Sequence, residues 1–417
     1  MPRLKGLFLT SLFLWFFLVA TSASAGTALS QCEPDATQSS GAIYRICMPA
    51  PQRWNGDLVL FAHGYVAFNE PVAIPEDQLC PPGGICLPTL VNSLGFAFAT
   101  TSYSTNGLAV LPGVQDVVDL VSVFTSAHGA PGHVYLTGAS EGGIVTALAI
   151  EQYPAVFDGG LAACGPIGDW NRQIDYFGDF RVLFDYFFPG LIPGSPTEIP
   201  EEVINNFDDL YTNMIRPVVF APANRHLLDQ LLKTAKVPYD KNDPTTIETS
   251  IHDALWYDVF ATNDATLKLG GQPFDNMKRI YFGSDNDLRL NIRVERVSAD
   301  AAATAEIAAH YQTTGALSRP LVTLHTTKDQ QVPYVHEILY QRKVRATGST
   351  PLHKNIPVFR YGHCNFKPID VVRAFARLVN LATGQSISLQ SVDARPRTPS
   401  AAMASHSRPR GLLPSAP

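Results

Sequence analysis

The stretch His133–Gly142, with the sequence HVYLTGASEG, decides how the rest of this chain is interpreted. Its first residues, His133–Leu136, form a short apolar run typical of a buried strand, and a helical pattern begins at Gly142. Between them, Gly138-Ala139-Ser140-Glu141-Gly142 is a G-x-S-x-G motif. In a strand-turn-helix context such a serine sits in a strained turn, and the glycines let strand and helix crowd together. The sequence therefore predicts that the Ser140 hydroxyl is exposed at the top of a sheet. The alternative is a glycine-rich turn with an incidental serine.

Strand and helix patterns alternate on both sides of this motif. Strands are expected at 57–62, 95–100, 133–136, 159–164, 321–325 and 358–361, and helices at 114–127, 142–153, 334–344 and 369–381. Such alternation predicts an α/β fold in which a mostly parallel sheet is flanked by helices.

Residues 166–319 interrupt this alternation and are too numerous for a loop. Helical patterns occur near 200–213, 223–236, 246–260 and 301–311, after an aromatic-rich start at 170–188. We interpret the segment as a mainly helical cap inserted between late strands, over the carboxyl ends where ligands bind. For most side chains of the aromatic run, core packing between cap and sheet is a better explanation than direct contact with a substrate.

An acid and a base follow the serine at the ends of later strands. Asp329 lies in a turn after the strand at 321–325, and His363 lies just after the strand at 358–361. A serine hydroxyl needs a base to take its proton and a third group to orient that base. Asp169, which follows the strand at 159–164, is the rival acid, and the Asp-x-x-Val-Pro turn favours Asp329.

The segment His63-Gly64-Tyr65 ends the first buried strand, where a backbone N–H can stabilise an oxyanion. We interpret His63 as a structural brace of this segment. The remaining candidates, His325, His336 and His353, are interpreted as ordinary fold residues, because no pair of them has the spacing of metal ligands.

From about Asp57 to Leu381 the chain resembles the α/β-hydrolase superfamily, in which the order along the chain is serine, acid, histidine. The resemblance implies that Ser140 is the nucleophile, that His363 is the general base and then acid, and that Asp329 orients it. It also implies an oxyanion hole made by the backbone N–H groups of Tyr65 and Glu141, with the Glu141 carboxylate pointing to solvent. No cofactor or metal is expected.

Six cysteines follow residue 25, and their even number favours disulfides in an oxidising compartment, with 15 possible connectivities. Local spacing suggests Cys32–Cys47 and Cys80–Cys86. This leaves Cys164 and Cys364 as a long-range pair or as buried free thiols. The tannase and feruloyl-esterase family bridges a cysteine beside its serine to one beside its histidine. Here Cys364 follows His363 but Ala139 precedes Ser140, so the likeness is partial, with Cys164 as the substitute partner.

Residues 1–25 have the pattern of a signal peptide: a basic head, an apolar run and an A-x-A cleavage site before Gly26. Its removal changes the formal net charge from −6 to −8, because it holds two basic residues and no acidic ones. A negative charge argues against nucleic-acid binding. The expected division is a signal peptide at 1–25, a hydrolase core at 26–165 and 320–391, a cap at 166–319 and a disordered tail at 392–417.

These features together predict a secreted, extracellular or periplasmic serine hydrolase that cleaves a carboxylic ester through an acyl-enzyme intermediate. The substrate is expected to be a small-molecule or polymeric ester, and no membrane span is expected after signal cleavage. An amidase or peptidase on the same triad is the nearest alternative, and a non-catalytic binding protein of the same fold is another. The oligomeric state stays open.

Overall fold

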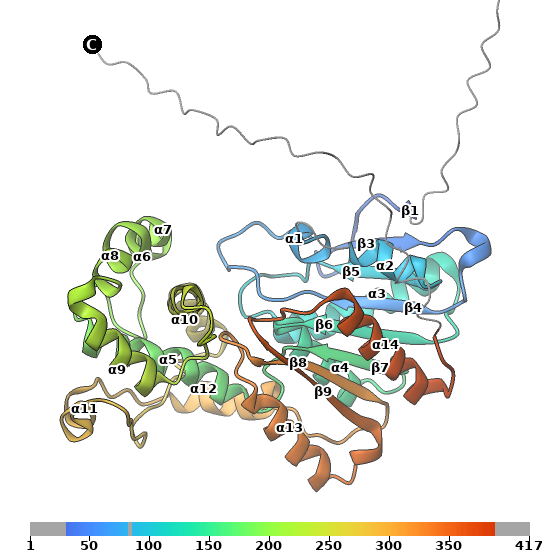
Figure 1. The fold of residues 1–417 in the computed structure, drawn as a ribbon. Coiled ribbons are helices and arrows are strands. Elements are labelled where there is room, and N and C mark those ends of the chain that lie inside the picture. The colour runs from blue at the N-terminus through green and yellow to red at the C-terminus, as the bar shows by residue number, and fades with distance from the viewer. Residues whose placement is uncertain (1–30, 82–85, 388–417) are drawn as a thin grey trace, which may run out of the picture.

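The computed structural model describes residues 31–81 and 86–387 (Figure 1). The expected signal peptide at 1–25 and the expected tail at 392–417 lie outside the described residues.

The core of the molecule is one mixed sheet with the strand order β1-β3-β5-β4-β6-β7-β8-β9, with β2 paired to β3. Strands β4 to β9 all run parallel to one another, whereas β3 pairs with β5 in the antiparallel sense. The strands are β1 (Gln31–Cys32), β2 (Ala36–Thr37), β3 (Ile43–Met48), β4 (Leu58–Ala62), β5 (Ala97–Thr101), β6 (Val134–Ala139), β7 (Gly159–Ala163), β8 (Leu321–Lys328) and β9 (His353–Tyr361). The expected α/β class and mostly parallel sheet are confirmed. The antiparallel strands β1, β2 and β3 at the start of the chain were not predicted from the sequence.

Helices cover both faces of the sheet. Alternate residues of β4 show the two layers: Leu58 and Leu60 pack in the cluster with α3 and α4, whereas Val59 packs in the cluster with α14. The first face carries α3 (Val110–His128), α4 (Glu141–Gln152) and α13 (Val335–Ala346), and the second carries α2 (Leu87–Ser93) and α14 (Pro368–Thr383). Helix α3 is long and apolar enough to cross a membrane, but it packs on α4 and β5 in this core.

Between β7 and β8 the chain forms the predicted helical cap, drawn from green to orange in Figure 1. Its main helices are α5 (Trp170–Phe187), α6 (Glu201–Asn205), α7 (Phe207–Leu210), α8 (Arg216–Val219), α9 (Arg225–Ala235), α10 (Thr245–Lys268), α11 (Asp287–Arg293) and α12 (Ala301–Glu306). The cap has its own hydrophobic cluster, which takes up Phe180, Phe184 and Phe187 of the aromatic run. Core packing therefore accounts for these three side chains. A fully buried ion pair between Arg181 and Asp258 (2.7 Å) joins α5 to α10.

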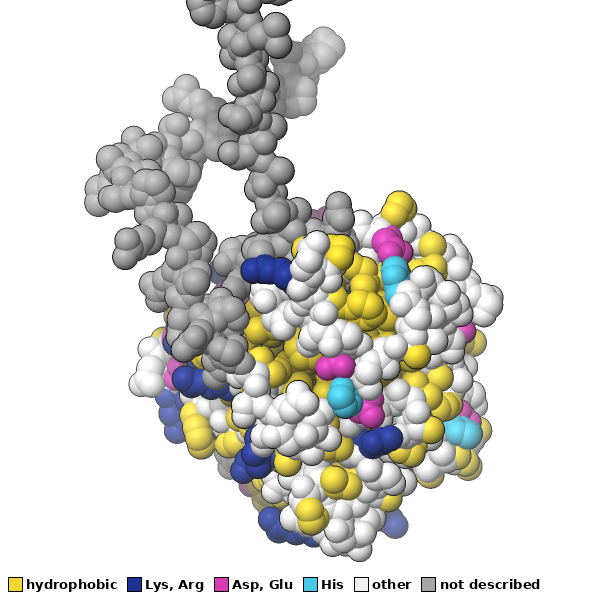
Figure 2. Space-filling view, turned by 90° about the vertical axis from the view of Figure 1, so that its right-hand side faces the viewer, with side chains coloured by type: hydrophobic (Ala, Val, Ile, Leu, Met, Phe, Trp, Pro, Cys, Tyr) yellow, Lys and Arg dark blue, Asp and Glu magenta, His cyan; other side chains and the backbone are white. Residues whose placement is uncertain are grey.

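Three disulfides connect the six cysteines: Cys32–Cys47, Cys80–Cys86 and Cys164–Cys364. The first joins β1 to β3, and the third joins the residue after β7 to a residue three positions beyond β9. The first two are the pairs that local spacing suggests, and the third is the long-range pair, the alternative to two buried free thiols. Figure 2 shows the end of the molecule opposite the cap, where acidic side chains and a histidine lie near the middle of the face and hydrophobic side chains gather above them.

The turn at Ser140 depends on very close backbone packing. Strand β6 ends at Ala139 and α4 begins at Glu141, and Ser140 between them has φ 57°. A Cβ at Gly138 would lie 2.1 Å from the carbonyl oxygen of Gly142, and one at Gly142 would lie 2.0 Å from that of Ala62. Neither backbone can move without separating α4 from the strands. Only glycine fits at these two positions.

We expect Gly138→Ala and Gly142→Ala each to lower the free energy of unfolding by about 3 kcal/mol or to prevent folding, because the new methyl group meets backbone atoms. Gly132→Ala is the matched control, since its Cβ would approach only the flexible Asp57 carboxylate closely, at 3.0 Å. Urea denaturation of the three variants measures the difference. Equal stability of all three would contradict this account of the turn.

Candidate active site

Ser140 is held at the carboxyl end of the sheet by backbone hydrogen bonds on both sides. Its N–H donates to the carbonyl of Ala163 at the end of β7 (2.9 Å), and its own carbonyl accepts from the N–H of Gly143 (2.9 Å). Ser140 lines two cavities, one within the core and one against the cap. The strained turn therefore places the serine where a bound molecule can reach it.

His363 and Asp329 form a direct pair beside the same cavity. The Nδ1 atom of His363 lies 2.8 Å and 3.0 Å from the two carboxylate oxygens of Asp329. Asp329 is fully buried, and the N–H groups of Gln331 and Val332 donate to its Oδ1 at 2.9 Å each. With Nδ1 facing the carboxylate, Nε2 is the nitrogen left to act as a base.

The charge state of Asp329 follows from these partners. Burial acts to raise the pKa of Asp329, but the electrostatic interaction with His363 and the hydrogen bonds from His325 and His363 outweigh it. The pKa therefore lies well below its usual range, and Asp329 stays ionised. A fixed carboxylate of this kind orients the imidazole and stabilises its protonated form.

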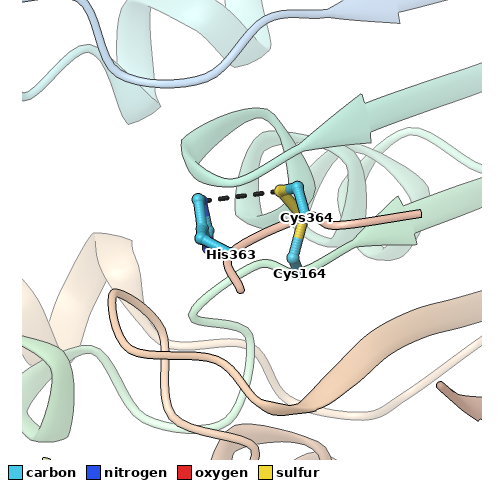
Figure 3. A group of neighbouring side chains, drawn as sticks. All are labelled: Cys164, His363 and Cys364. Atoms are coloured by element: carbon cyan, nitrogen blue, oxygen red, sulfur yellow. Dashed lines mark hydrogen bonds between the residues drawn. A yellow bond between two sulfur atoms is a disulfide. The ribbon is translucent and has the colours of Figure 1, made fainter. Parts of the chain in front are cut away.

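The Ser140 and His363 side chains line the larger cavity together, but within residues 31–81 and 86–387 no hydrogen bond joins them. The Nε2 atom of His363 instead lies 3.5 Å from Sγ of Cys364, next to the Cys164–Cys364 disulfide (Figure 3). Catalytic hydrogen bonds are often long without substrate and tighten when it binds. The pair is positioned for such a contact.

Asp169, the rival acid, has a different environment. Its carboxylate accepts from the N–H of Asn171 (3.1 Å) at the start of α5 and from the side-chain amide of Gln312 (2.8 Å). It caps a helix of the cap and makes no hydrogen bond to His363 among those the structure describes.

The segment His63-Gly64-Tyr65 lies against the serine. A Cβ at Gly64 would be 3.1 Å from Cβ of Ser140, and the Gly64 N–H donates to the Gln78 side chain (2.7 Å), which holds the segment in place. His63 is buried and stacks on Tyr103, with ring centroids 3.9 Å apart. Burial lowers the pKa of His63. Its position matches a structural brace.

The expectation that the Glu141 carboxylate points to solvent is wrong. Glu141 is 5% exposed, and its Oε1 accepts from the N–H of Ala109 (2.9 Å) just before α3. Burial raises the pKa of Glu141 to about 8. The first turn of α4 is buried beside the start of α3, so this side chain is shielded from bulk solvent.

His325, interpreted from the sequence as an ordinary fold residue, lies directly behind Asp329. Its Nε2 is 3.4 Å from Oδ2 of Asp329, and its Nδ1 is 3.2 Å from Oε1 of Glu337. Burial alone lowers the pKa of His325, but the two carboxylates outweigh it and raise the pKa to about 10. The two carboxylates therefore favour the protonated form of His325, which in turn helps to lower the pKa of Asp329. Only the i, i+4 spacing of His325 and Asp329 hints at this contact in the sequence.

Tyr257 of α10 is the residue that the cap brings to the serine. It lines both cavities with Ser140, its hydroxyl donates to the Gln331 side chain (3.1 Å), and its ring stacks on Phe177 with centroids 4.9 Å apart. No motif in the sequence marks Tyr257, because the contact depends on how the cap folds over the core.

Among the described residues, Cys164, His363 and Cys364 are the one group with the mutual distances of metal ligands. Figure 3 shows that the two cysteines are bonded to each other. A disulfide has no thiolate to offer, so this group does not fit a metal.

No protein-family model matches the sequence, and no curated protein sequence matches it significantly. Solved structures with a similar fold include an acylaminoacyl peptidase of Pyrococcus horikoshii (11% identity, TM-score 0.40, 80% of this chain and 37% of that one). Others are feruloyl esterase B of Aspergillus oryzae (16%, 0.44, 84% and 80%) and an esterase of Pyrococcus furiosus (10%, 0.43, 86% and 91%). The chain spans about two fifths of the length of the peptidases it matches. These likenesses are distant and concern the fold alone.

The architecture itself is that of the α/β-hydrolase fold. A parallel sheet carries a serine on a strand-turn-helix at the end of β6, an acid after β8 and a histidine after β9.

The environment of His325 predicts how stability depends on pH. Its pKa is raised from 6.5 to about 10 in the folded chain, so its contribution is complete below pH 6.5 and is lost as the pH rises through 10. Between these limits the folded state holds the extra proton, and wild-type stability should fall with pH more steeply than that of His325→Gln. The difference in slope should approach ~1 kcal/mol per pH unit.

Urea denaturation from pH 7 to 10 measures both slopes, and a general loss of stability in the variant does not affect the comparison. His226→Gln is the matched control, since His226 is exposed and lies far from Asp329 in the cap. Parallel profiles for wild type and His325→Gln would show that His325 is not a buried cation.

Proposed function

We propose that this protein is a secreted serine hydrolase that cleaves a carboxylic ester through an acyl-enzyme intermediate. The observation that supports this most strongly is the Asp329–His363 pair, which faces the same cavity as the serine of the strained turn. A nucleophile, an oriented base and a buried carboxylate in this order are the parts that acyl transfer needs.

In the proposed reaction, Oγ of Ser140 attacks the ester carbonyl while Nε2 of His363 takes its proton. The carbonyl oxygen becomes an oxyanion, to which the backbone N–H groups of Tyr65 and Glu141 donate. His363 then gives its proton to the leaving alcohol, and the acyl group stays on Ser140. A water molecule, deprotonated by His363, releases the acid and restores the serine. Asp329 stays ionised throughout.

An ester is favoured over a peptide by the walls of the larger cavity. Among the described residues that line it, Asp77 in helix α1 (Glu76–Leu79) carries the one carboxylate, and none is a lysine or arginine. A peptidase that holds a chain terminus usually needs a charged group in its pocket, whereas an apolar ester does not. Secretion is supported by the three disulfides, which form and persist mainly in oxidising compartments.

The choice of acid is tested by Asp329→Asn and Asp169→Asn. Asp329→Asn should lower kcat by roughly 10⁴-fold, because the imidazole loses the carboxylate that fixes its tautomer. Asp169→Asn should leave kcat within a few fold of the wild type. It should lower the free energy of unfolding only slightly, because asparagine also caps a helix N-terminus well. Ester hydrolysis by both purified variants measures this, and the opposite ranking would assign the acid to Asp169.

An active-site-directed fluorophosphonate probe tests the nucleophile. The wild type should be labelled, and Ser140→Ala should be unlabelled and lose roughly 10⁴–10⁶-fold in kcat while its fold is retained. Ser126→Ala, at an exposed serine of α3, is the matched control and should behave as the wild type. Labelling of Ser140→Ala at the wild-type level would exclude Ser140.

Ester and amide specificity are separated by p-nitrophenyl butyrate and butyryl p-nitroanilide, which share the same acyl group. The ester should be cleaved and the anilide cleaved far more slowly. Comparable kcat/KM values for the two would instead indicate an amidase. A well-folded wild type that is neither labelled nor active would favour a binding protein.

A further inference from the structure

The second face of the sheet is not fully covered by helices. Helix α2 packs on β3 and β5, and α14 packs on β7 and β8. The middle strands β4 and β6 lie between the two helices, which Figure 1 shows on the same face. A cavity of about 500 Å³ fills this gap, which is within the size range of small-molecule sites.

The cavity begins at the reaction centre and runs along the strands. Ser140 and His363 line one end, and Val59, Leu94 and Phe375 line it further in. Val59 pairs with Tyr135 in the sheet, five residues before Ser140. At about 3.3 Å per residue of strand, the lining from Val59 to Ser140 extends over ~16 Å. The cavity is therefore an elongated channel along the second face of the sheet, and it shares Tyr65, Ser140 and Tyr257 with the smaller cavity against the cap.

The walls of the channel are apolar away from the serine. The inner lining consists of Val59, Phe61, Leu90, Val91, Leu94, Phe98, Leu161, Val371, Val372 and Phe375. The Thr137 hydroxyl, midway along, already donates to the carbonyl of Leu60 (2.9 Å). The other polar residues are Tyr65, Asp77, Gln78, Tyr257 and His363, and Gln78, which follows Asp77 in α1, hydrogen-bonds to Gly64 beside Ser140. Among the described residues, the inner lining thus offers no unpaired polar side chain to a ligand.

We propose that this channel receives an unbranched aliphatic chain of the ester, with the scissile carbonyl at Ser140. The inference rests on the proposed function and names its substrate class. A length of ~16 Å suits an extended chain better than a single aromatic ring, and apolar walls without free donors select against hydroxylated or charged groups. The chain can belong to the acid or to the alcohol of the ester, and separate substrate series distinguish these.

The second cavity at Ser140 is much smaller, about 90 Å³, and lies against the cap. It is lined by Trp170, Phe177 and Tyr257 among others. The substrate is therefore asymmetric, with one long apolar half in the core and one short half under the cap.

The first experiment compares p-nitrophenyl acetate, butyrate, octanoate and dodecanoate with butyl, octyl and dodecyl acetate. In the series that carries the chain, kcat/KM should rise by up to roughly fourfold per buried methylene, and more than tenfold from the shortest to the longest ester. A rise in the first series assigns the chain to the acid, and a rise in the second assigns it to the alcohol. A flat or falling profile in both overturns the inference.

The second experiment blocks the inner end of the channel. Leu94→Trp and Val59→Phe should lower kcat/KM for the dodecyl substrate at least tenfold more than they lower kcat/KM for the butyrate. Two variants are used because Val59 is buried and its substitution can affect folding, whereas Leu94 is partly exposed. Leu288→Trp, at an exposed leucine of the cap, is the matched control. Equal loss on butyrate and dodecanoate would contradict a chain-specific channel.

Binding is measured apart from catalysis with Ser140→Ala, which lacks the nucleophile. Calorimetry should show that this variant binds dodecanoate, below its micelle concentration, at least tenfold more tightly than butyrate and with a negative heat-capacity change. When Leu94→Trp is combined with Ser140→Ala, dodecanoate and butyrate should bind with equal affinity. Failure of fluorophosphonate labelling with intact dodecanoate binding would overturn the proposed function but keep the channel. Fluorophosphonate labelling of the wild type without any chain-length preference in binding would support the proposed function and overturn the channel.

Discussion

The close backbone packing at Gly138 and Gly142 is the constraint on which the rest of the site depends. Because Gly142 touches the carbonyl of Ala62, the end of β4 and the segment that follows it must lie beside Ser140. A Cβ at the neighbouring Gly143 would lie 2.8 Å from the carbonyl oxygen of Ala163, so the end of β7 is also close to this turn. One set of contacts therefore brings Ser140, the segment His63-Gly64-Tyr65 and Cys164 together. A side chain at either of the first two glycines would separate them.

A disulfide ties the loop that carries His363 to the end of β7 beside Ser140. Cys164 follows β7 and is bonded to Cys364, so the residue after His363 is tied to the strand end beside the serine. On its other side, His363 is held by Asp329, which is fixed in turn by two backbone N–H groups and by His325. The loop after β9 is also anchored at Gly362, whose N–H donates to the carbonyl of Lys328 (3.2 Å) and whose carbonyl accepts from the Thr326 hydroxyl (2.6 Å). The disulfide and the buried carboxylate add to these anchors on the two sides of His363.

The sequence predicts the parts of this arrangement that carry a local pattern. The strands of the parallel sheet are continuous apolar runs, and the motif at Ser140 and the turn at Asp329 have recognisable neighbours, so the fold class and the placement of these residues at strand ends follow from them. The sequence does not predict contacts that depend on how layers pack. The burial of Glu141 beneath α3, the approach of Tyr257 from the cap and the support of Asp329 by His325 are contacts of this kind. The short antiparallel strands were missed because two of them have only two residues each.

The channel illustrates why packing decides more of the substrate than the motif does. The triad chemistry is common to esterases and amidases, and it sets no preference for chain length. That preference comes from two helices, α2 and α14, each of which packs on its own pair of strands and leaves the middle of the sheet between them. An apolar gap within a core normally costs stability, because its walls lose their packing partners. Here each helix is fixed independently of the other, so the gap persists without collapsing. A substrate chain that fills it regains those contacts, and binding energy remote from the carbonyl then becomes available at the reacting serine.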